Sequence, residues 1–129
     1  MLLDAQCLFS DAQAITATAA STNVVRFGKG DFTFVPLLIQ VVENFATLTS
    51  LTITVQTATD SAFTTAVDLA SSTIAVANLT KGTVVPINYI PKGNLGYIRI
   101  YYTVTGSNAT AGKITAGVVA GIDKGISEI

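Results

Sequence analysis

The sequence contains no histidine and only one cysteine in 129 residues. The absence of histidine removes the commonest general base, the Ser-His and Cys-His nucleophile pairs and the usual zinc ligand. The single cysteine, Cys7, excludes an intramolecular disulfide, and we expect it to be a small buried side chain. The sequence therefore predicts a protein that is not an enzyme and that holds no metal ion and no cofactor.

Charge is also scarce. Charged residues make up 12% of the chain and hydrophobic residues 50%, whereas an average globular domain has about 25% charged residues. The seven basic residues are scattered, so no basic stripe can neutralise successive phosphates, and direct nucleic-acid binding is not expected. Threonines that alternate with Val, Ile and Leu cover part of the surface. The remaining apolar surface predicts a homo-oligomer, either a dimer or a trimer.

Long hydrophobic runs are missing as well. No apolar run reaches the ~20 residues that a membrane-spanning helix needs, so no membrane partner is expected. The segment before Arg26 carries no basic residue and lacks the positive start of a signal peptide. We therefore expect the protein to be made, folded and assembled in a cytoplasm.

What the sequence does contain is alternation of apolar and polar residues with a period of two, which is typical of half-buried β-strands. Residues 97–105 alternate in this way, with an inward face formed by Ile98, Ile100, Tyr102 and Val104. Residues 113–119 resume the alternation after a break at Gly106, Ser107 and Asn108, which tolerate turn conformations. The two segments are therefore predicted to form a β-hairpin with which the other strands pair.

Further strands are predicted at residues 24–27, 37–42, 48–56, 67–69, 73–76 and 83–90. In one of them Leu51, Ile53 and Val55 are expected to face inward. Residues 43–46 are predicted to be a connection, Ser10 and Asp11 to be a turn, and Phe63 to fold its loop back onto the core. About eight short strands and no convincing helix predict one all-β domain, an antiparallel β-sandwich or jelly roll with an extended N-terminal arm.

Three parts of this domain are predicted: an N-terminal arm with the first strand (1–23), a jelly-roll β domain (24–120) and a C-terminal tail (121–129). Residues 2–15 are expected to be extended. The apolar residues of the arm precede the predicted turn and lie outside the regular strand spacing; they are Leu2, Leu3, Leu8 and Phe9. This placement is typical of a segment that docks on a neighbouring subunit, and the alternative is that it pairs as an edge strand of its own domain.

Few side chains point to chemistry. Asp60 and Asp68 are a carboxylate pair of the kind that a glycosidase uses, but both lie in turn-like contexts where aspartate is ordinary. Four tyrosines and Arg99 are the residue types on which a carbohydrate-binding module stacks sugars; the tyrosines are Tyr89, Tyr97, Tyr101 and Tyr102. The same residue types are enriched at protein interfaces, and this interpretation is favoured.

Three stretches together resemble the capsid cement (decoration) proteins of tailed double-stranded DNA bacteriophages: LLDAQCLFSDAQAITATAASTNVV, LTITVQTATDSAF and GYIRIYYTVTGSNATAGKITAGVV. The resemblance spans almost the whole chain, and residues 121–129 extend past it. The positions that match the family pattern are Gln56, Asp60, Phe63, Arg99, Tyr102, Thr103, Val104 and residues 110–117.

The resemblance implies a jelly-roll protein that oligomerises on the outside of the virion and clamps neighbouring major capsid proteins of the same phage. Residues expected to bind the partner are Leu2, Leu3, Leu8, Phe9, Tyr97, Arg99 and Tyr101. The alternative function is a carbohydrate-binding β-sandwich module that uses its surface tyrosines, and an enzyme comes third.

Overall fold

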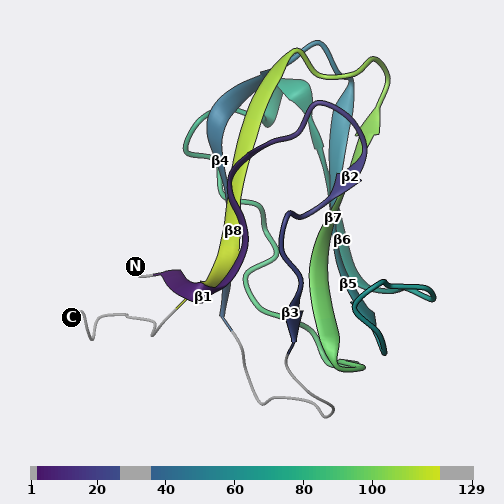
Figure 1. Ribbon diagram of the computed structural model, residues 1–129. Coiled ribbons are helices and arrows are strands. Elements are labelled where there is room, and N and C mark those ends of the chain that lie inside the picture. Colours follow the sequence, from purple (N-terminus) through teal and green to yellow (C-terminus); the bar gives the residue numbers. More distant parts are fainter. Residues whose placement is uncertain (1–2, 27–35, 120–129) are drawn as a thin grey trace.

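The computed structural model describes residues 3–26 and 36–119, and for residues 3–7 and 119 it describes the backbone alone (Figure 1). The predicted C-terminal tail at 121–129, the side chain of Cys7 and residue 27 of the predicted strand 24–27 lie outside this description. The described part is an antiparallel β-sandwich, as the alternating pattern predicted. The jelly-roll connectivity that the resemblance implies stays a prediction.

Two sheets face each other in Figure 1. The three-stranded sheet has the order β1-β8-β4, with bounds Leu3–Ala14, Ala111–Val119 and Leu37–Ala46. The five-stranded sheet has the order β2-β7-β5-β6, and β3 also pairs with β7; their bounds are Ala19–Ala20, Tyr97–Thr105, Ser50–Ala58, Val67–Ala75 and Val25–Arg26. A short 3-10 turn, η1 (Val76–Asn78), follows β6.

The core lies between the sheets, and alternation along β5 and β7 builds much of it. These strands pair without interruption from Ser50↔Thr105 to Ala58↔Tyr97. The predicted inward faces are confirmed: Val104 is partly buried against the core, and the other predicted inward residues are completely buried, namely Leu51, Ile53, Val55, Ile98, Ile100 and Tyr102. Each side chain of this kind contributes roughly 1.5–3 kcal/mol when it leaves water.

The predicted hairpin of residues 97–105 and 113–119 is wrong, although both strands exist. β7 lies in the five-stranded sheet and β8 in the three-stranded sheet. The connecting residues 106–110 cross between the layers, where the N–H of Ala109 donates to the Thr16 carbonyl at 2.9 Å and that of Thr110 to the Ala46 carbonyl at 3.1 Å. Alternation specifies which face of a strand is buried, but it does not specify to which sheet the strand belongs. That is decided by how the two sheets pack against each other across the core, about 10 Å apart.

The N-terminal strand belongs to the domain itself. β1 pairs antiparallel with β8 from Leu3↔Val119 to Ala14↔Lys113, so the extended conformation expected for residues 2–15 is confirmed over 3–14. Residues 3–14 therefore form an edge strand of their own domain, which was the alternative to an arm that docks on a neighbouring subunit. The predicted turn at Ser10 and Asp11 is wrong because β1 continues through both residues as an irregular strand, with Ser10 completely buried.

Two further boundaries differ from the prediction. Residues 43–46 are part of β4 rather than a connection, and residues 67–69 and 73–76 merge into the single strand β6 and the turn η1. Residues 83–90 form isolated bridges to β4 at Val84 and to Pro36 at Tyr89 instead of a strand. Pro86 explains this irregularity, since it has no N–H to donate to a ladder.

Candidate partner-binding surface

Tyr97, Arg99 and Tyr101 alternate on the outer face of β7, and all three are half-buried. The predicted grouping of these three side chains on one face is therefore what the structure shows. Arg99 lies opposite Gln56 on β5, and Tyr101 lies opposite Thr54. β7 has neighbours on both sides, so this group is in the middle of the five-stranded sheet rather than at its edge.

A chain of hydrogen bonds holds Arg99 in place across three strands. Its Nε–H donates to Gln56 Oε1 at 2.8 Å, and Gln56 Nε2 donates to Asp68 Oδ1 at 3.0 Å. Within the described residues, the two Nη groups of Arg99 have no hydrogen-bond partner and no ion pair. The guanidinium is thus oriented through one edge while its other donors stay available.

The guanidinium of Arg99 lies over the ring of Phe63, a side chain that is itself only 6% exposed. Arg99 Cζ lies 4.3 Å from the centroid of the Phe63 ring and 5.1 Å from that of Tyr101. Both distances are within the range of cation–π attraction, which contributes roughly 0.5–2 kcal/mol. We call Arg99, Gln56, Phe63 and Tyr101 the Arg99 cluster.

Hydrogen bonds within the loop between β5 and β6 position Phe63 against Arg99. The Asp60 carbonyl accepts the N–H of Phe63 at 3.1 Å, and Asp60 Oδ2 accepts the Thr64 hydroxyl at 2.9 Å. Phe63 has a positive φ of 54°, an uncommon conformation for an aromatic residue that persists only where the surroundings enforce it. Phe63 folds back as predicted, but onto the outer-face Arg99 and not into the core cluster between the sheets.

The predicted carbohydrate-binding set comes together only in part, since Tyr97, Arg99 and Tyr101 share the outer face of β7 while Tyr102 and Tyr89 lie elsewhere. Tyr102 is completely buried on the inner face, where its hydroxyl shares a 2.8 Å hydrogen bond with Ser10 Oγ on the opposite sheet. Burial raises the pKa of Tyr102 above its usual value, and the hydrogen bond with Ser10 offsets part of that rise. Tyr101 carries the Arg99 guanidinium over its ring, and Tyr89 lies on the segment beside β4.

The predicted partner-binding residues of the N-terminal segment differ in how far they are buried. Leu2 lies outside the described residues, and for Leu3 the description covers the backbone, which pairs with Val119. Leu8 is half-buried, but Phe9 is completely buried in the core cluster and has no surface to offer in this conformation. Sequence reasoning placed Phe9 outside because it relied on the turn at Ser10, which the structure does not contain.

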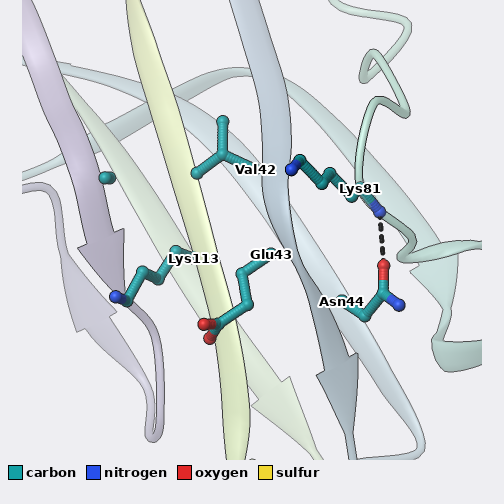
Figure 2. Close-up of a pocket in the computed structure, with 6 residues that line it drawn as sticks. Val42, Glu43, Asn44, Lys81 and Lys113 are labelled. Carbon is teal, nitrogen blue, oxygen red and sulfur yellow. Dashed lines mark hydrogen bonds between the residues drawn. The ribbon is translucent and has the colours of Figure 1, made fainter.

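A groove of about 610 Å³ on the outer face of the three-stranded sheet had no signal in the sequence (Figure 2). Its lining consists of Ala12, Val42, Glu43, Asn44, Lys81 and Lys113. Ala12 and Val42 are residues at which β1 and β4 lose register against β8, so two bulges flank Lys113. Bulges redirect side chains out of the alternating pattern, and alternation therefore cannot predict such a groove.

Hydrogen bonds brace the walls of this groove. Asn44 Oδ1 accepts the N–H of Lys81 at 2.6 Å, drawn in Figure 2, and Glu43 Oε1 accepts the N–H of Gly112 at 3.0 Å. Neither lysine side chain makes an ion pair inside residues 3–26 and 36–119.

In the described ranges, no group of three His, Cys, Asp or Glu side chains is placed to hold a metal ion. No helix there has the length and apolar character needed to cross a membrane.

The family model Bbp16 matches residues 9–118, which is well over half of the chain. No curated protein matches the sequence.

Proposed function

Since this chain belongs to the Bbp16 family, which is phage-associated, we propose that it is a structural protein of the virion, specifically a capsid cement protein. It binds the outside of a tailed-phage capsid and clamps neighbouring major capsid proteins against one another. The match over residues 9–118 is the observation that carries this proposal, together with the resemblance to cement proteins described above. The proposal assigns the protein no catalytic reaction, no nucleic-acid contact and no membrane contact.

The Arg99 cluster supports the proposal. Gln56, Phe63 and Arg99 belong to the positions that resemble the cement-protein pattern, yet they come from two strands and a loop far apart in the sequence. They meet on the outer face of the sheet, and none of them fills the core between the sheets. Arginine and aromatic side chains that are held rigid at a surface are frequent anchors of protein interfaces.

The proposal includes a homo-oligomer, either a dimer or a trimer. Among the described residues, five large hydrophobic side chains are at least 37% exposed: Val24, Val67, Val84, Tyr89 and Leu95. They are spread over several segments, and a second copy and the capsid would each cover some of them. Light scattering at micromolar concentration should give a dimer or trimer mass, whereas a monodisperse monomer contradicts this part of the proposal.

Binding to particles tests the function itself. Purified protein is added to phage particles that lack it, and the mixture is centrifuged through a density gradient. We expect it to travel with the particles at a fixed ratio and to raise the temperature at which they release DNA. Protein that stays at the top of the gradient at every concentration contradicts the proposal.

A further inference from the structure

The guanidinium of Arg99 is held in one orientation, but only one of its N–H donors makes a hydrogen bond within the described residues. Its Nε–H is committed to Gln56, and the rings of Phe63 and Tyr101 lie against it. Its Nη groups have no partner in the described part of the chain, and no carboxylate there pairs with its charge. The Nη donors of a half-buried arginine arranged in this way are available to a ligand from outside the domain.

We propose that the Arg99 cluster binds a single carboxylate, the side chain of an Asp or Glu on the major capsid protein. The partner named here depends on the proposed function, whereas the carboxylate specificity depends on the cluster alone. A guanidinium presents parallel N–H groups that match the two oxygens of a carboxylate. Because Gln56 and Phe63 already hold the side chain, little conformational entropy is lost when the ligand arrives.

Charge around the cluster favours a carboxylate over a phosphate. Asp68 ends the hydrogen-bond chain that begins at Arg99, and Asp60 shapes the loop that carries Phe63. The Asp68 carboxylate, one hydrogen bond beyond Gln56, repels a dianion more strongly than a monoanion. Arg26 on β3 is exposed and lies opposite Tyr97 on β7, so it adds positive charge to the same face without belonging to the cluster.

Arg26 also provides a matched control. Arg26→Gln and Arg99→Gln remove the same charge from the same face, but only Arg99→Gln removes the braced guanidinium. Arg99→Lys keeps the charge and removes the planar fork, so it separates general attraction from bidentate binding. Thermal unfolding of each variant confirms that it is folded before binding is compared.

The first test uses the free protein and acetate as the probe. Acetate replaces chloride at constant ionic strength while NMR follows the Nε–H of Arg99 and the side-chain amide of Gln56. We expect shifts that saturate in the wild type and in Arg26→Gln, and a Gln56 signal that does not respond in Arg99→Lys. A wild-type protein without a saturable response, or one that responds more strongly to inorganic phosphate than to acetate, overturns the inference.

The second test uses phage particles. Arg99→Gln should weaken binding to particles about 30-fold or more, the low end for removing one partner of a buried charge pair, whereas Arg26→Gln should have a much smaller effect. If wild type and Arg99→Gln bind particles equally, this inference fails while the capsid function stands. If the wild type does not bind particles, the proposed function fails and the acetate titration decides the carboxylate site. A change of oligomeric state in Arg99→Gln would assign the cluster to contact between copies and overturn the inference.

Discussion

The two sheets of the sandwich differ in regularity. In the five-stranded sheet, β5 pairs with β7 along nine consecutive positions without a register shift, and it shifts register once against β6, between Val55 and Gln56. In the three-stranded sheet, β8 loses register at three places against β1 and at two against β4. The comparison shows that an unbroken ladder presents side chains in strict alternation, whereas a bulged ladder re-aims them and opens a groove.

The two outer faces differ accordingly in how they present charge. The five-stranded sheet carries one guanidinium, which Gln56 braces and which lies over the Phe63 ring. On the three-stranded sheet, Lys113 of β8 and Lys81 of the turn beside β4 line a groove, without an ion pair in the described residues. A braced cation is suited to selecting the shape of its partner, and loosely held cations contribute general attraction.

The largest effect is expected where the regular ladder faces the core. Ile100→Asp buries an uncompensated carboxylate on β7, at a cost of several kcal/mol that is comparable with the whole stability of a domain. Circular dichroism should show an unfolded protein. Ser71→Asp on exposed β6 is the control and should remain folded; Thr54, outward on β5 but 6% exposed, is too buried for this purpose.

The second-largest effect is expected for a side chain that the three-stranded sheet contributes to the same core. Phe9→Ala should lower the free energy of unfolding by about 3–5 kcal/mol, because Phe9 is completely buried. The half-buried neighbour Leu8 provides the comparison, and Leu8→Ala should cost clearly less. Denaturant unfolding measures both values. Similar small losses in the two variants would mean that β1 is not part of the core.

A smaller loss of stability is expected from a substitution at Gly112, where the backbone of β8 lies against the Phe45 ring of β4. Gly112 has a φ of 136°, and a Cβ added there would overlap the Phe45 ring. Gly112→Ala therefore combines backbone strain with overpacking. Gly82 also has a positive φ, but a Cβ added there meets no atom within 4 Å. Gly112→Ala should cost about 1–3 kcal/mol more than Gly82→Ala in thermal unfolding, and equal costs would show that Phe45 moves aside freely.

The smallest effect concerns the hydrogen bond that joins the two sheets. Tyr102→Phe removes the hydroxyl that contacts Ser10, and the expected loss near neutral pH is about 1 kcal/mol. Ser10 keeps its 2.7 Å hydrogen bond to Gln13, so no buried group is left without a partner.

The same variant has a pH signature. Burial raises the pKa of Tyr102 in the folded state, so above about pH 10 the unfolded chain loses this proton while the folded chain keeps it. The stability that Tyr102 contributes is fully present below about pH 10 and is lost as the pH rises further. The melting temperature of the wild type should fall more steeply than that of Tyr102→Phe between pH 9 and 11. Parallel curves would show that Tyr102 reaches solvent.

Part of the candidate surface was predictable from the sequence. Alternation placed Tyr97, Arg99 and Tyr101 together on an outward face, because side chains two apart on a strand share a side. Gln56 and Phe63 were part of the family resemblance, but their contact with Arg99 depends on the pairing of β5 with β7 and on the Asp60 loop. The groove was not predictable, since bulges have no periodic signature.

The sequence by itself determined the all-β class, the inward faces of β5 and β7 and the scarcity of residues for chemistry, because composition and a period of two are local properties of the chain. Only the tertiary structure decided that β7 and β8 belong to different sheets, that Phe9 is in the core and that Arg99 lies over the Phe63 ring. These outcomes depend on contacts between distant residues. Which strands become neighbours is decided by the burial of two apolar faces against each other, and neither face carries that information alone.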